Sequence, residues 1–121
     1  EFDLGLPLAG IGACTKALDA ALNARWPGAI IVFYGHLGDG NIHLQVATPC
    51  VAPHPGHAIE DLVYDVLRAH GGTVTAEHGL GTLKAPYLGH CRSAAEIALM
   101  RRLKTALDPA GILNPGKVLA G

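Results

Sequence analysis

Two histidines flank an Asp-Gly pair in the stretch FYGHLGDGNIHLQV, residues 33–46. Apolar residues run away from the pair on both sides, a pattern typical of a β-hairpin with a tight turn. If Asp39 and Gly40 are the central residues of that turn, His36 and His43 are cross-strand partners, on the sheet face that points away from the apolar core. Facing residues carry β-carbons about 4.5–5.5 Å apart, so the two imidazoles can converge on one metal ion. A pair of solvated or hydrogen-bonded histidines explains the pattern equally well.

A candidate third ligand lies in TAEHGLGTLK, residues 75–84. Glu77 and His78 end a strand-like run and meet glycines that let the backbone turn tightly. If this run joins the same sheet, Glu77 can project onto the histidine face, and His78 can reach an open coordination position at the turn. Two imidazoles and one carboxylate suit zinc, iron or manganese, with positions left open for a substrate. The alternative is a helix-capping glutamate and an ordinary turn histidine.

The same stretch contains a second, weaker signal. The turn GLGTLK can form a small anion-binding nest with the ammonium group of Lys84. Ordinary turn chemistry accounts for these residues as well.

The hydrophobic periodicities predict the elements that must position these side chains. We expect strands over residues 2–6, 29–37, 41–47 and 73–78, and helices over 8–26, 59–67 and 93–107, followed by a tail over 108–121. The order strand, helix, strand, strand, helix, strand is that of a ferredoxin-like split βαβ fold. The sequence therefore predicts an α+β domain, with an antiparallel sheet, helices on one face, and a C-terminal helix and tail.

The third helix has its own start signal. Ser93 followed three residues later by Glu96 is a capping box. The apolar stripe of this helix is expected to face inward; it comprises Ile97, Met100, Leu103 and Leu107.

Composition limits the class of protein. Half of the 121 residues are hydrophobic, which is enough for one core, so we expect a single domain over residues 1–121. Nine basic residues against ten acidic ones give a net charge of −1, which disfavours nucleic acid as a partner. No apolar stretch approaches the ~20 residues needed to span a bilayer. The three cysteines are widely spaced and favour a reducing compartment, the cytoplasm.

Three motifs, in this order and at these separations, resemble the C-terminal domain of FAD-linked oxidases. They are YGHLGDGNIHLQV (34–46), TAEHGLGTLKAPYL (75–88) and ALDPAGILNPGKVL (106–119). This family of flavoproteins includes D-lactate dehydrogenase, the glycolate oxidase flavin subunit and D-2-hydroxyglutarate dehydrogenase. The resemblance implies that FAD is bound mainly by a larger N-terminal domain of the same parent chain. That domain is absent from these residues, so the fragment alone is expected to be inactive.

The resemblance also implies roles for individual residues. It makes His36, His43 and Glu77 the ligands of a divalent metal, commonly zinc, and His78 the base that takes the hydroxyl proton of the substrate. It further makes Asn41 and Lys84 candidate substrate contacts and Asn114 a candidate contact to the substrate or the flavin edge. The implied reaction oxidises a small D-2-hydroxy acid to a 2-oxo acid with hydride transfer to flavin. A homodimer is compatible with this interpretation.

Two other interpretations stay open at this point. The chain can be a ferredoxin-like module that binds metal or self-associates through its sheet face, without redox activity of its own. It can also be a flavoprotein homologue that uses its histidines directly on the substrate, without metal.

Overall fold

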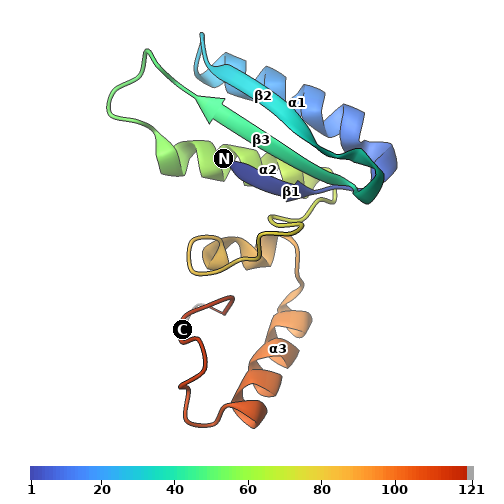
Figure 1. Ribbon diagram of the computed structural model, residues 1–121, viewed down its shortest axis with the longest axis vertical. Coiled ribbons are helices and arrows are strands. Elements are labelled where there is room, and N and C mark those ends of the chain that lie inside the picture. The colour runs from blue at the N-terminus through green and yellow to red at the C-terminus, as the bar shows by residue number, and fades with distance from the viewer. Residues whose placement is uncertain (120–121) are drawn as a thin grey trace.

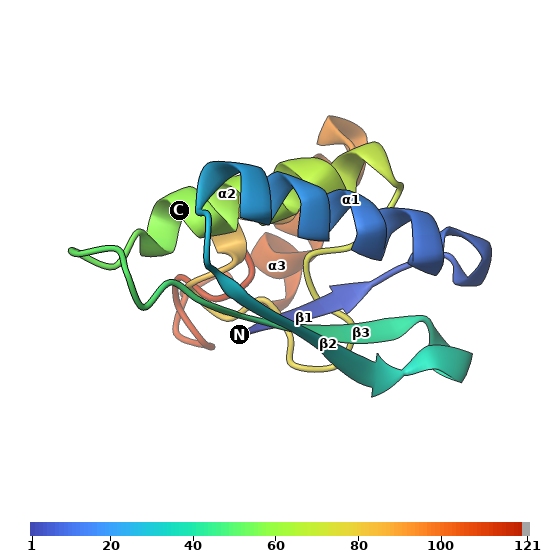
Figure 2. The ribbon, with the colours of Figure 1, turned by 90° about the horizontal axis from the view of Figure 1, so that it is seen from above.

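A three-stranded antiparallel sheet carries two helices on one face in the computed structural model, which describes residues 1–119 (Figures 1 and 2). The last two residues of the predicted tail, 120–121, lie outside the described residues. The strands are β1 (Phe2–Gly5), β2 (Ile30–His36) and β3 (Asn41–Ala47), in the order β1-β3-β2. The two helices are α1 (Ile11–Arg25), preceded by the short helix η1 (Leu8–Gly10), and α2 (Gly56–Ala69).

The helix α1 connects β1 to β2, and β3 lies between these two strands. This is the split βαβ arrangement, so the predicted fold class is confirmed. Alternation along each strand sends one set of side chains under the helices. The resulting core is almost completely buried and includes Leu4, Leu18, Leu22, Leu44, Val63 and Leu67. The opposite sheet face carries the polar residues that form the candidate site, together with the exposed Ile30 and Val32 of β2.

The predicted fourth strand over residues 73–78 is wrong. Only Thr73 pairs with the sheet, through an antiparallel bridge to Gly5 at the free edge of β1. The Thr73 hydroxyl then donates to the carbonyl of Thr75 at 2.8 Å, and the chain turns away from the strand direction. The amides of Ala76, Glu77 and His78 are directed at the side chain of Asp3 and not at the backbone of β1.

The predicted hairpin register is also wrong. The turn contains the short helix η2 (Leu37–Asp39) and Gly40 in the left-handed conformation with φ 71°. It is therefore longer than a two-residue turn. As a result His36 faces Asn41, and Tyr34 faces His43, so the two histidines are not direct cross-strand partners. They still share one face of the sheet, because Asn41 and His43 are two residues apart on β3.

The C-terminal part of the chain lies below the sheet layer in Figure 1. It contains the short helix η3 (Ala85–His90) and the helix α3 (Ala94–Leu107). The predicted capping box is confirmed: the Glu96 amide donates to Ser93 Oγ, and the Ser93 amide donates to Glu96 Oε2.

The prediction that the apolar stripe of α3 faces inward is wrong. No residue of this helix is buried, and Leu103 and Leu107 are 54% and 80% exposed. Ile97 and Met100 are only partly covered. The stripe has helical spacing, but α3 projects away from the sheet and its two covering helices, so within residues 1–119 no layer closes over it.

No helix in this described part of the chain combines the length and hydropathy that a bilayer crossing requires.

Candidate functional site

Asp3 lies on the polar side of the sheet, in the edge strand β1. Its neighbours in β1, Phe2 and Leu4, point into the core, so alternation turns the Asp3 carboxylate to the opposite face. The side chain is nonetheless buried, with the residue 1% exposed. It is covered by the segment 75–78, which takes the place of the predicted fourth strand.

One oxygen of Asp3 holds this segment. Oδ2 accepts hydrogen bonds from the Thr75 hydroxyl at 2.8 Å and from the amides of Ala76, Glu77 and His78 at 2.9, 3.0 and 2.9 Å. Burial by itself raises the pKa of the carboxyl, but these hydrogen bonds outweigh it and hold the pKa of Asp3 at about 2. Asp3 is therefore a carboxylate throughout the physiological pH range.

Glu77 and His78 lie next to His43 as a result. Glu77 Oε1 is 3.1 Å from His43 Nε2 and 3.6 Å from His78 Nε2. The rings of His43 and His78 are stacked, with centroids 5.4 Å apart and an interplanar angle of 22°. The His43 side chain is 8% exposed, whereas Glu77 and His78 are about half exposed at 44% and 52%. The side chains of Glu77 and His78 thus reach solvent, whereas His43 beside them is buried.

Four residues can offer ligand atoms to a single point. One such atom from each of Asp3, His43, Glu77 and His78 lies within 4.8 Å of the others. His36 is outside this group and is exposed, although its ring centroid is 5.7 Å from that of His43. The structure therefore brings together two of the three predicted ligands, together with the predicted base.

This donor set fits a divalent metal ion. Imidazole nitrogens and carboxylate oxygens are ligands for zinc and related metals. His43 Nδ1 and Asp3 Oδ1 are buried without a hydrogen-bond partner among the described residues. Buried polar atoms are normally satisfied, so an orphaned nitrogen and an orphaned oxygen in one cluster are unusual.

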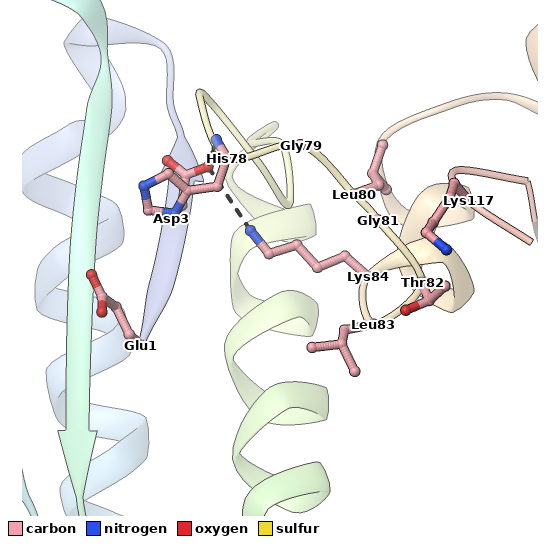
Figure 3. A pocket seen from close by; sticks show the side chains of 10 residues that line it. All are labelled: Glu1, Asp3, His78, Gly79, Leu80, Gly81, Thr82, Leu83, Lys84 and Lys117. Atoms are coloured by element: carbon pink, nitrogen blue, oxygen red, sulfur yellow. Dashed lines mark hydrogen bonds and ion pairs between the residues drawn. The ribbon is translucent and has the colours of Figure 1, made fainter. Parts of the chain in front are cut away.

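A pocket of about 460 Å³ opens beside Asp3 and His78. Its other wall is the glycine-rich turn from Gly79 to Lys84, and Lys117 from the C-terminal segment also lines it (Figure 3). Lys84 reaches toward the sheet, with its Nζ 3.9 Å from Asp3 Oδ2. Burial lowers the pKa of Lys84, and the nearby Asp3 carboxylate partly offsets this effect. The pocket therefore places two amine side chains and one imidazole around a space that the carboxylates of Glu1 and Asp3 also line.

The remaining predicted residues differ in their placement. Asn41 is buried on the same face as His43, and its Oδ1 has no hydrogen-bond partner among the described residues. Asn114 is exposed in the C-terminal segment, with φ 47°, and its carbonyl accepts a hydrogen bond from the Lys117 amide. It is not among the residues that line the pocket described above.

Sequence reasoning missed Asp3 and Lys117. For Asp3 there was a signal: in FDLGL a lone charged residue lies between apolar ones, on the face that alternation assigns to the histidines. Lys117 carries no such local signal, because its approach to the pocket depends on a hydrogen bond between the Val118 amide and the Gly81 carbonyl, at 2.8 Å.

The fold and the site define an α+β domain with imidazoles and carboxylates gathered at the rim of a pocket. Residues 1–118 match the family of FAD linked oxidases, C-terminal domain. The chain therefore belongs to this family, and the resemblance of its three motifs is confirmed.

Curated proteins similar to this chain have consistent names. It is 35% identical to D-2-hydroxyglutarate dehydrogenase of Stutzerimonas stutzeri, over 98% of this chain and 26% of that protein. It is 43% identical to the mitochondrial D-2-hydroxyglutarate dehydrogenase of Bos taurus, over 98% of this chain and 22% of that protein. Identity to a putative mitochondrial D-lactate dehydrogenase of Schizosaccharomyces pombe is 42%, over 72% of this chain and 16% of that protein. The chain thus spans about a quarter or less of the length of these relatives.

Proposed function

We propose that this chain is the substrate-side domain of an FAD-dependent dehydrogenase that oxidises a D-2-hydroxy acid to a 2-oxo acid. Family membership and the names of the relatives support the reaction class. The observation that carries the proposal is the convergence of ligand atoms from Asp3, His43, Glu77 and His78 at a pocket rim. FAD, the hydride acceptor, would be bound mainly by a domain outside these residues.

A divalent metal, zinc in our proposal, would be held by His43 and Glu77 from within the cluster and by His36 from beside it. When bound, such an ion supplies Lewis-acid stabilisation of the negative charge that develops on the substrate oxygen. His78 stacks on His43, and Glu77 contacts both rings, so two of the proposed ligands and the proposed base lie side by side.

His78 is the proposed general base. Its ring is half exposed, lines the pocket, and lies 3.6 Å from the Glu77 carboxylate. It can therefore take the hydroxyl proton of a substrate in the pocket while the neighbouring carboxylate stabilises the imidazolium that results. A positioned base of this kind contributes about 10²–10⁴-fold to the rate.

The substrate carboxylate is proposed to bind near Lys84, with Lys117 adding positive charge from the other side of the pocket. Asn41 is a proposed substrate contact because its buried amide oxygen lacks a partner among the described residues. The role of Asn114 at the flavin edge remains a prediction.

The test uses the full-length flavoprotein that carries these residues. Under anaerobic conditions, D-lactate, glycolate and D-2-hydroxyglutarate are each mixed with the enzyme, and bleaching of the flavin absorbance is followed. We expect His78→Ala to slow flavin reduction by about 10²–10⁴-fold while metal content is retained. His57→Ala is the matched control, because that imidazole is 96% exposed and its one polar partner among residues 1–119 is Glu60.

Metal binding is tested separately by elemental analysis of the same protein. We expect His43→Ala and Glu77→Gln each to lower zinc content sharply, and His57→Ala to leave it unchanged. Full zinc content in both site variants would remove the metal from the proposal. A full-length protein that binds zinc but whose flavin no 2-hydroxy acid reduces would favour the non-redox module instead.

Location and assembly stay predictions. The relatives from Bos taurus and Arabidopsis thaliana are named as mitochondrial proteins, so the predicted cytoplasmic location requires its own fractionation experiment. The predicted homodimer requires a mass measurement in solution.

A further inference from the structure

Asp3 belongs to the cluster of ligand atoms, but the proposed reaction uses it neither as a metal ligand nor as a base, although its carboxylate is the most buried charge beside the site. A carboxylate that is 1% exposed is costly unless donors compensate its charge. All four of its hydrogen bonds come from one short segment, residues 75–78, and all four reach the same oxygen. The charge is thus compensated by the segment that carries Glu77 and His78.

This segment has few other contacts to fix it. Within residues 1–119, the amides of Ala76, Glu77 and His78 donate to Asp3 and to no other group. The side chains of Glu77 and His78 are about half exposed, so packing restrains them only in part. The backbone position of both functional residues therefore depends on Asp3.

The direction of the hydrogen bonds explains where the two side chains point. Three consecutive amides aimed at one carboxylate curl the chain around Asp3, instead of leaving it extended along β1. From this curl Glu77 reaches His43, and His78 faces the pocket (Figure 3). Lys84 approaches the same Asp3 oxygen from the far end of the glycine-rich turn, at 3.9 Å.

We propose that Asp3 is a positioning residue: it fixes the backbone of residues 75–78 so that Glu77 is held against His43 and His78 against the pocket. This inference rests on the proposed function, in which Glu77 is a metal ligand and His78 takes the substrate proton. A displacement of about 1 Å in a reacting group can cost roughly 10²-fold in rate, so a tether of this kind acts on turnover without touching the substrate.

The test compares three variants of the full-length flavoprotein. Asp3→Ala removes the acceptor, and Asp3→Asn keeps an amide oxygen that can face the same donors. Asp19→Ala is the matched control, because Asp19 is an exposed carboxylate on α1, on the other side of the sheet. Thr75→Val removes one donor only, and it serves if Asp3→Ala does not fold.

Hydrogen exchange of the amides at 76–78 is measured without substrate. Hydrogen bonds to a charged acceptor are stronger than those between neutral groups, so we expect exchange to accelerate at least ~10-fold in Asp3→Ala, and less in Asp3→Asn and Thr75→Val. Exchange in the core of β3 should change far less. Unchanged exchange at 76–78 in folded Asp3→Ala would overturn the proposal.

Flavin reduction then tests the link to turnover. At saturating substrate we expect Asp3→Ala to reduce the rate by ~10²-fold with little change in KM, and Asp3→Asn to restore much of it. If Asp3→Ala exchanges faster at residues 76–78 but reduces flavin at the wild-type rate, Asp3 has a structural role only, and the proposal is wrong. Loss of zinc in Asp3→Asn with unchanged exchange would make it a metal ligand instead. If His78→Ala itself leaves reduction unaltered, the proposed function fails, while the exchange result on Asp3 still stands.

Discussion

Gly40 ends the hairpin turn, and replacing it with alanine should damage the sheet, whereas the same change two residues earlier should not. Gly40 has φ 71°, and its carbonyl accepts a hydrogen bond from the Leu6 amide at 2.8 Å. A β-carbon at position 40 would collide with the Leu6 carbonyl oxygen. At Gly38 the added carbon meets no atom within 4 Å.

Two costs add up in Gly40→Ala. The left-handed conformation costs a residue with a β-carbon about 1–2 kcal/mol. The overlap falls on backbone, so the connection after β1 must shift, at a further ~1–3 kcal/mol. We therefore expect β1 and β3 to lose about 2–5 kcal/mol of local stability. Gly38→Ala should stay within about 0.5 kcal/mol of the wild type.

Hydrogen exchange of β1 and β3 in the full-length protein measures this difference. Because about 1.4 kcal/mol corresponds to a factor of ten, exchange should be roughly 30- to 4,000-fold faster in Gly40→Ala. Equal exchange in Gly40→Ala and Gly38→Ala would refute the argument that the left-handed turn and its contact with Leu6 fix the hairpin.

Three further predictions concern other contacts. The stability that Asp3 contributes to the folded protein should depend on pH. Its pKa is about 2 in the folded protein against an ordinary value of 3.8, so this stabilisation is complete above pH 4 and is lost as the pH falls through 2. The difference in local unfolding free energy between the wild type and Asp3→Asn should therefore narrow by about 1 kcal/mol from pH 7 to pH 3, after allowance for solvent screening; a constant difference would contradict the pKa. Ser93→Ala should weaken the first turn of α3 by about 0.5–2 kcal/mol, seen as faster exchange there, while the exposed Thr105→Ala serves as the control. Tyr87→Phe removes a 2.8 Å hydrogen bond to Asp61 and should loosen η3 from α2 by about 0.5–1.5 kcal/mol; unaltered exchange in η3 would argue against that bond.

Local patterns predicted the elements whose partners are near in sequence. Alternation over residues 30–47 identified β2 and β3, and the Ser93 capping box located the start of α3. Each of these signals lies within a few residues of what it determines. The structure also places His43, Glu77 and His78 together, although the sequence argument for Glu77 relied on a fourth strand that does not form.

The errors arose where a distant residue decides the local structure. Residues 73–78 alternate like a strand, but their amides are taken by Asp3, more than 70 positions earlier. The Asp39-Gly40 pair indicates a two-residue turn, yet the Gly40 carbonyl bonds to Leu6 and the turn is longer, so His36 moves out of register with His43. The apolar stripe of α3 is regular and therefore predicted a buried face, but no local signal shows that this helix does not pack against the sheet.

The hydrogen bonds between Asp3 and the site segment close loops of 72 to 75 residues. Closing a long loop costs chain entropy before any contact repays it, so such bonds form late in folding. We expect the hairpin and its helices to assemble first, and the curl around Asp3 only after β1 has paired with β3. During synthesis, the cluster of imidazoles and carboxylates would then form last, after the sheet and the helices that cover it are in place.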